Sequence, residues 1–148
     1  MIPLYVLVAG FVLFLLIGHL GVLYFQGWQH ALRAALGIMF LLTASAHEGR
    51  RRPDLIAMVP APFSRAAMLV TLTGIAEIAG AIALQIPALA SFAAAGLFLM
   101  LIAIFPANVL AARNRLSIGG RSVPALLPRA LIQIIFLIAL GFAAFPRQ

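Results

Sequence analysis

Cysteine and lysine are absent from this chain of 148 residues, and charged residues of any kind make up only 9% of it. The absence of cysteine excludes disulfides, thiol redox chemistry, iron–sulfur ligation and cysteine-bound zinc. The scarcity of charge excludes a soluble globular domain, because about 25% of the residues in such domains are charged. It also excludes a disordered chain, which needs many charges and low hydrophobicity.

Apolar residues account for 65% of the chain, and its mean hydropathy is +1.16. They form long uncharged runs, and a membrane-spanning helix needs about 20 mainly apolar residues. The length therefore allows one membrane domain of four or five helices and leaves no room for a soluble domain. We predict an all-α membrane protein with a single domain over residues 1–148. It consists of a four-helix transmembrane bundle over residues 31–145 and an additional N-terminal transmembrane helix over residues 2–25.

Five segments of the sequence are expected to form these helices. The first, Ile2–Phe25, lacks the basic start of a secretory signal peptide, so we interpret it as a retained transmembrane helix. Pro87 separates the third segment from the fourth, since proline cannot donate a helical hydrogen bond. The remaining segments are approximately Ala31–Ala46, Ala66–Gln85, Ala88–Ala112 and Pro124–Phe145.

The segment Ala31–Ala46 is the weakest of the five spans, because Arg33 lies near its start. It crosses the membrane if the Arg33 guanidinium snorkels outward from the first helical turn. A re-entrant or interfacial segment is the alternative, since the uncharged run is short.

The net charge of +7 comes entirely from an excess of arginine. On a soluble chain this excess would suggest nucleic acid, but here the arginines lie between apolar runs, where they control topology. We therefore expect membrane lipid and no nucleic acid as a partner. With five spans, the connections 48–65 and 113–123 lie on one side with most of the arginines. The positive-inside rule places that side in the cytoplasm and the C-terminus on the other side. Arg50–Arg52 is interpreted as a topology signal, with binding of anionic lipid head groups as the alternative.

Glu77 is the main functional clue within the membrane, because it lies about eleven residues into its helix, near the middle of the bilayer. A charged carboxylate is costly at that depth, so we expect it to be paired, protonated or beside a water-filled cavity. Two interpretations stay open. Glu77 handles protons or holds a ligand, or it is a buried carboxyl that joins a neighbouring helix.

Four further polar residues match Glu77 in depth if successive helices run in opposite directions. His47 ends its helix, Asn108 follows the helix-weakening Pro106, and Arg129 and Gln133 lie one turn apart on one helix face. We predict one polar pocket that opens toward the cytoplasm and is lined by His47, Glu77, Asn108, Arg129 and Gln133. Arg129 is the expected cationic partner of Glu77, and His47, reached through water, is the alternative. No residue is assigned a catalytic or metal-binding role, and a haem between His19 and His30 has no support.

Several short patterns, spread over roughly Leu32–Phe142, resemble the DoxX family of small membrane proteins. An arginine-led helix ends in a Gly-x-x-His-like turn, with Ala44 and Glu48 where that family usually has glycine and phenylalanine. A Ser/Thr-Gly-x-x-Glu-x-x-Gly helix and an Arg-x-x-x-Gln pair follow at the corresponding places. The matching stretches are Arg33–Gly37, Ala44–His47 with Pro53, Val59–Pro62, Thr73–Gly80 with Leu84–Pro87, Phe105–Asn108 and Arg129–Gln133.

The resemblance implies a four-helix membrane core over residues 31–145 and a place in the inner (plasma) membrane of a bacterium. That family is named for association with quinone-linked oxidoreductases of sulfur compounds, and its relatives include assembly factors. The first expectation is therefore a non-catalytic subunit or assembly factor that binds a membrane oxidoreductase. A quinone- or lipid-linked redox component, with Glu77 and His47 handling protons, is the second. A small-molecule or proton-coupled permease is the third.

Overall fold

A computed structural model of the chain describes residues 2–122 and 125–145. Pro124, the predicted start of the last segment, and Arg147, assigned to the side opposite the Arg-rich loops, lie outside these residues. The elements in chain order are α1 (Ile2–His19), the short 3-10 helix η1 (Leu23–Phe25), α2 (Trp28–Glu48), α3 (Arg52–Ala57), α4 (Ala66–Ala83), α5 (Pro87–Arg113), β1 (Ser117–Ile118), β2 (Arg121–Ser122) and α6 (Leu126–Ala144).

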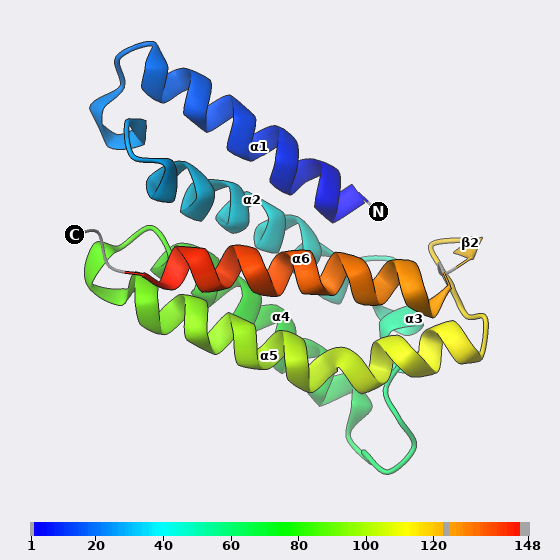
Figure 1. Cartoon of the computed structure of the whole chain (residues 1–148). Helices are drawn as coiled ribbons and strands as arrows, with labels where there is room; N and C mark the ends of the chain where they lie inside the picture. Colours follow the sequence, from blue (N-terminus) through cyan, green and yellow to red (C-terminus); the bar gives the residue numbers. More distant parts are fainter. Residues whose placement is uncertain (1, 123–124, 146–148) are drawn as a thin grey trace.

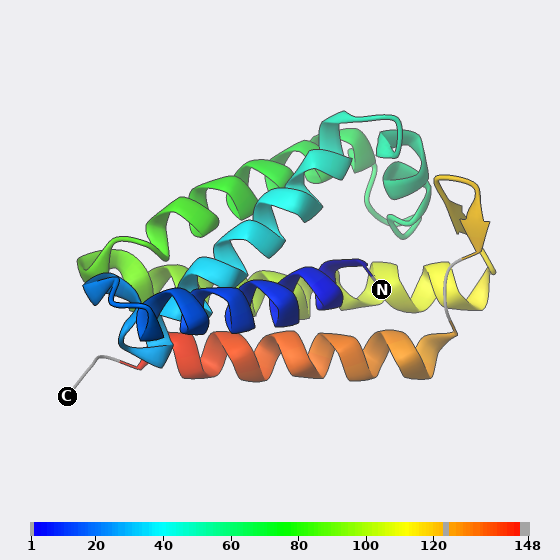
Figure 2. The ribbon, with the colours of Figure 1, turned by 90° about the horizontal axis from the view of Figure 1, so that it is seen from above.

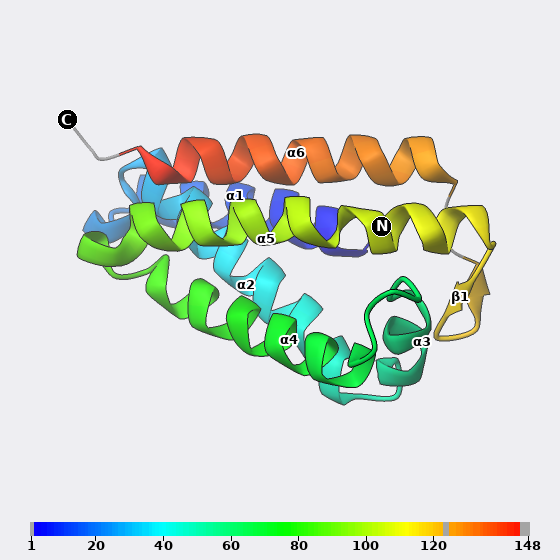
Figure 3. The same ribbon diagram turned by 90° about the horizontal axis from the view of Figure 1, so that it is seen from below.

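Five long helices form the bundle of the described chain (Figure 1). α1 packs on α2, α2 packs on α4, and α5 lies against α6 with the opposite direction. Figure 2 and Figure 3 show that α2 crosses the bundle at an angle to the α5–α6 pair. The all-α prediction, a bundle with an additional helix at its N-terminal end, is confirmed.

Four of these helices, α1, α4, α5 and α6, are long and apolar enough to cross a membrane. α2 does not share their composition, although its 21 residues extend about 31 Å at about 1.5 Å per residue. It runs without interruption from one end of the bundle to the other (Figure 1). α2 is therefore a continuous helix of membrane-spanning length, longer than the predicted Ala31–Ala46.

Burial explains why α2 is less apolar than its neighbours. It contains ten buried residues, whereas α1 contains two. Its side chains Leu36, Met39 and Phe40 are almost fully buried and form the core with Leu84 of the α4–α5 connection and Leu140 of α6. Because α2 packs against protein, it needs fewer apolar residues than a helix that faces lipid.

The first helix ends earlier than predicted, at His19 instead of Phe25. Gly21 adopts a φ of +106°, a left-handed conformation that favours glycine and cannot continue an α-helix. The chain then turns through η1 into α2.

The two Arg-rich connections lie at the same end of the bundle, which holds α3 and the β1–β2 hairpin (Figures 1 and 3). Gly119 and Gly120 form the two-residue hairpin loop, and both have positive φ angles, as a type I′ turn requires. The Gly119 amide donates to Asp54 Oδ2 of α3 at 2.8 Å. We call this the Arg-rich end. The α1–α2 and α4–α5 connections and the end of α6 lie at the opposite end.

Candidate functional site

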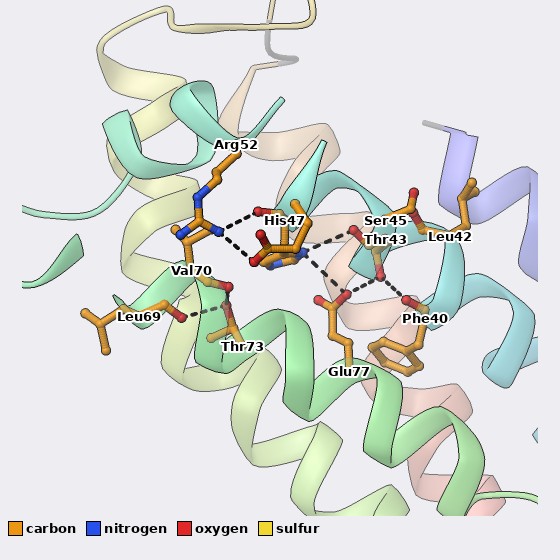
Figure 4. Close-up of polar contacts among 11 residues, drawn as sticks. Phe40, Leu42, Thr43, Ser45, His47, Arg52, Leu69, Val70, Thr73 and Glu77 are labelled. Carbon is orange, nitrogen blue, oxygen red and sulfur yellow. Dashed lines mark hydrogen bonds and ion pairs between the residues drawn. The ribbon is translucent and has the colours of Figure 1, made fainter. Parts of the chain in front are cut away.

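Glu77 of α4 points into the bundle toward α2, and only 4% of it is exposed. Its Oε2 atom accepts a hydrogen bond from the Thr43 hydroxyl at 2.6 Å. The same oxygen lies 3.9 Å from Nδ1 of His47 (Figure 4). The carboxyl is therefore paired within the protein and does not face lipid. We call Thr43, His47 and Glu77 the carboxyl cluster.

Helical spacing places Thr43 and His47 beside Glu77. The two residues are four positions apart on α2, so both side chains lie on the face that packs against α4. Nδ1 of His47 lies 3.2 Å from the Thr43 carbonyl oxygen. Because a carbonyl oxygen only accepts, a hydrogen bond between these two atoms requires the proton on Nδ1. Thr43 is not among the residues predicted from the sequence, although its position one helical turn before His47 is a signal that points to it.

Gly74 makes room for the imidazole. A Cβ atom at this position would lie 2.7 Å from Cβ and 2.9 Å from Cγ of His47, which is too close for any real contact. Gly74 is three residues before Glu77, so the glycine and the carboxyl lie on the same face of α4. The Gly-x-x-Glu spacing in the sequence thus places the glycine that leaves space for the His47 ring next to the Glu77 carboxyl.

Arg52, the first residue of α3, closes the carboxyl cluster on the Arg-rich side (Figure 4). Its guanidinium donates to the His47 carbonyl oxygen at 2.9 Å and to Glu48 Oε1 at 2.7 Å. It also donates to Thr71 Oγ1 at 2.8 Å, which joins the end of α2 to the beginning of α4. The sequence-based interpretation of Arg50–Arg52 as a topology signal does not include this contact of Arg52. The contact could have been predicted from the position of Arg52 just after the C-terminus of a helix. The last carbonyl groups of a helix lack helical partners, and a cation there is favourable.

Asn108, Arg129 and Gln133 form a second group, which we call the amide cluster, between α5 and α6. Asn108 Nδ2 donates to Gln133 Oε1 at 3.0 Å, and Arg129 Nη2 donates to Asn108 Oδ1. Gln133 Nε2 donates to the Leu101 carbonyl oxygen at 2.8 Å. These contacts give hydrogen-bond partners to the amide groups of Asn108 and Gln133 at the interface of α5 and α6.

The expected pairing of Arg129 with Glu77 is wrong. In the described part of the chain, Glu77 lies beside His47, and Arg52 forms an ion pair with Glu48. Arg129 instead contacts α5, because α6 packs mainly on that helix, whereas Glu77 faces α2. The structure thus brings the five predicted pocket residues together as two clusters. Two cavities of about 310 Å³ each lie elsewhere, one near His19 and one between Ala94 and Leu140.

Arg33 does not snorkel outward, contrary to the sequence-based interpretation. It is 6% exposed, and its guanidinium donates to the carbonyl oxygens of Ala143 at 3.0 Å and Phe145 at 3.1 Å. These carbonyl groups end α6, where partners are missing and a cation is favourable. Ser91 of α5 donates to the Ala144 carbonyl oxygen at 2.6 Å. Side chains of α2 and α5 therefore supply the hydrogen-bond donors for the last carbonyl groups of α6.

Two histidines stay apart from these clusters. His19 is exposed at the end of α1, and the His30 ring lies 4.7 Å from the Tyr24 ring, centroid to centroid. Over residues 2–122 and 125–145, no group of three or more His, Cys, Asp or Glu side chains is arranged to hold a metal ion.

The fold and its polar interior define a small helical membrane bundle whose least apolar helix is buried at the centre. The chain belongs to the family described as Domain of unknown function (DUF8561), which matches residues 36–143. The matched range includes both clusters and leaves α1 and Arg33 outside. No curated protein and no solved structure matches the chain.

Proposed function

We propose that this protein is a non-catalytic integral membrane subunit or assembly factor, as its resemblance to the DoxX family implies. The observation that supports this function is the mutual pairing of the five candidate residues. Thr43 and His47 contact Glu77, and Asn108 bonds to both Arg129 and Gln133. Such pairing joins neighbouring helices and gives a partner protein a defined surface to bind.

The proposed partner is a membrane oxidoreductase, and the proposed location is the inner membrane of a bacterium with the Arg-rich end in the cytoplasm. The proposed partner and the proposed location both follow from the resemblance to the DoxX family. The gathering of the arginine-bearing connections at one end supports the orientation, because such connections remain on the cytoplasmic side.

The test combines chemical crosslinking in membranes with purification in a mild detergent and mass spectrometry. We expect an oxidoreductase subunit in fixed stoichiometry, and we expect that enzyme to lose abundance or activity when the gene for this chain is deleted. Glu77→Gln, which keeps an oxygen acceptor for Thr43, should restore the enzyme in full if the role is structural. Loss of the enzyme's activity with a folded Glu77→Gln protein would contradict a non-catalytic role.

A quinone- or lipid-linked redox component is the second candidate, and the contact between His47 and Glu77 favours it. Reduction of a quinone consumes protons, and an imidazole beside a carboxyl is a suitable proton donor. This function predicts a quinone in the purified protein and loss of its redox signal in Glu77→Gln. A proton-coupled permease, the third function implied by the sequence, predicts solute flux into proteoliposomes that depends on Glu77.

A further inference from the structure

We propose that the carboxyl cluster is a proton-exchange site, in which Glu77 takes up and releases a proton through His47 toward the Arg-rich end. The ligand is the proton itself, and the three groups involved are the Thr43 hydroxyl, the Glu77 carboxyl and the His47 imidazole. The hydroxyl and the imidazole both lie near Oε2 of Glu77 (Figure 4). The inference does not depend on the accessory function, because it concerns the isolated bundle and no partner protein.

The Thr43 hydroxyl is the first part of the argument. Its oxygen lies 2.6 Å from Glu77 Oε2 and 3.0 Å from the Phe40 carbonyl oxygen, yet a hydroxyl group has one proton to donate. When Glu77 is ionised, Thr43 donates to Oε2. When Glu77 is protonated, the carboxyl donates to Thr43 Oγ1, and the threonine proton turns to the Phe40 carbonyl oxygen.

Rotation about one bond therefore satisfies both protonation states of the buried carboxyl. A buried donor or acceptor without a partner costs about 1–3 kcal/mol, and this arrangement avoids that cost in either state. The hydroxyl thus makes proton uptake and release compatible with the packed interface of α2 and α4.

His47 provides the route. Its side chain is 13% exposed, whereas the Glu77 side chain is 5% exposed, so the imidazole lies on the outer side of the carboxyl. Nδ1 lies 3.2 Å from the Thr43 carbonyl oxygen and 3.9 Å from Glu77 Oε2. That gap is longer than a hydrogen bond and short enough for one bridging water to connect the two atoms.

The transfer step balances without any further reactant. A proton from the Arg-rich side converts the imidazole to imidazolium, and Nδ1 then releases its proton, through the water, to Oε2. The carboxylate becomes a neutral carboxylic acid, and the imidazole is left neutral with its remaining proton on Nε2. Release of the proton follows the same steps in reverse.

The other charged and titratable groups near the pair have partners of their own or lie apart from it. Arg52 of α3 donates to the main-chain carbonyl oxygen of His47. Glu48, on the same helix, is occupied by Arg52. The other titratable groups on elements that pack against α2 and α4 are exposed or bonded elsewhere: Tyr5 and His19 of α1, Tyr24 of η1, Asp54 of α3, Arg113 of α5 and Arg129 of α6.

Infrared spectroscopy of the full chain in lipid bilayers tests the proposal, with protons and heavy water as the only probes. The chain contains two glutamates, so Glu48→Gln protein labelled with carbon-13 glutamate carries one labelled carboxyl, at Glu77. We expect its protonated band to disappear and return reversibly as the pH is raised and lowered while the fold stays intact. A band that stays the same at every pH at which the protein is folded would overturn the proposal.

Variants of the cluster identify the route. General acid–base groups accelerate proton transfer about 10²–10⁴-fold, so His47→Gln should slow deuterium exchange of the Glu77 carboxyl about 100-fold or more. Thr43→Val should shift the carboxyl band, and Thr43→Ser should restore it. Thr73→Val is the matched control, because the Thr73 hydroxyl bonds only to carbonyl oxygens of its own helix. Exchange at the original rate in a folded His47→Gln protein would exclude His47 as the route.

Discussion

Arginine has different roles at the two ends of the bundle. At the Arg-rich end, side chains such as Arg50, Arg65 and Arg113 are exposed. At the opposite end, Arg33 is buried and binds the last carbonyl groups of α6. The chemical group is the same, but exposure leaves the first set available to orient the protein in the membrane, whereas burial makes Arg33 part of the packing.

The comparison continues within the Arg-rich end. Arg52 lies two residues from the exposed Arg50, yet it binds groups of α2 and α4. The role of each arginine therefore follows from its contacts and burial, and the number of arginines in a connection does not reveal it.

The largest expected effect is the difference in membrane side between the two ends of the bundle. Reporter fusions within the β1–β2 hairpin and after α6 should report opposite sides of the membrane, with the hairpin in the cytoplasm. The reason is that two connections rich in arginine lie at one end of the bundle. Reporters on the same side would mean that α6, the helix between the two sites, does not cross the membrane.

Arg33→Met should be the most destabilising of the arginine substitutions. It removes the side-chain partner of the buried Ala143 carbonyl oxygen, and an unsatisfied buried acceptor costs about 1–3 kcal/mol. The Phe145 carbonyl oxygen also loses Arg33 but keeps Gln29 Nε2 as a donor. We expect a loss of about 1–3 kcal/mol, measured by denaturant unfolding in detergent. Arg50→Met is the control, because substitution of an exposed residue usually changes stability by no more than about 0.5 kcal/mol. Equal losses in the two variants would break the contrast between the ends.

Gly74→Ala should destabilise the Arg-rich end by about 1–3 kcal/mol, the usual cost of overpacking. The new Cβ would lie 2.7 Å from the His47 Cβ, and both atoms are close to the backbone. Gly96→Ala, in α5, is the matched control, since a Cβ there meets nothing within 4 Å. Alanine is the better helix former, so this control should keep or slightly raise the thermal unfolding temperature. A Gly74→Ala protein as stable as the control would disprove the close packing of His47 against Gly74.

Arg52→Gln should have the smallest measurable effect, about 0.5–1.5 kcal/mol, because its hydrogen bonds are partly exposed to water. Comparison with Arg50→Gln under the same denaturation conditions separates the contacts of Arg52 from the loss of one positive charge. If the two variants unfold alike, Arg52 belongs functionally with the exposed arginines.

The long apolar helices could be predicted from the sequence because their residues face lipid, and lipid imposes hydropathy on nearly every exposed position. The ends of the helices were less predictable. α1 stops at His19 through the conformation of Gly21, whereas the hydropathy continues to Phe25. The central position of α2 was also hidden, because an apolar run interrupted by Arg33 fits a buried helix and an interfacial one equally well.

The candidate site was predictable in its members and not in its grouping. Depth in the membrane identified Glu77, His47 and the amide cluster, since depth follows from helix length and direction. Which residues touch depends on how the helices turn toward one another. α4 turns Glu77 toward α2, and α6 turns Arg129 toward α5.

Composition and the spacing of charges by themselves determined that this is an all-α membrane bundle with most of its arginines in two connections. The reason is that the bilayer acts on each residue through its own hydrophobicity and charge. Only the tertiary structure decided that Thr43 and His47 accompany Glu77, that Arg52 closes this cluster, and that Arg33 ends α6 instead of reaching out of the membrane. Those outcomes depend on distances of a few ångström between helices that are remote in sequence, and no local pattern carries that information.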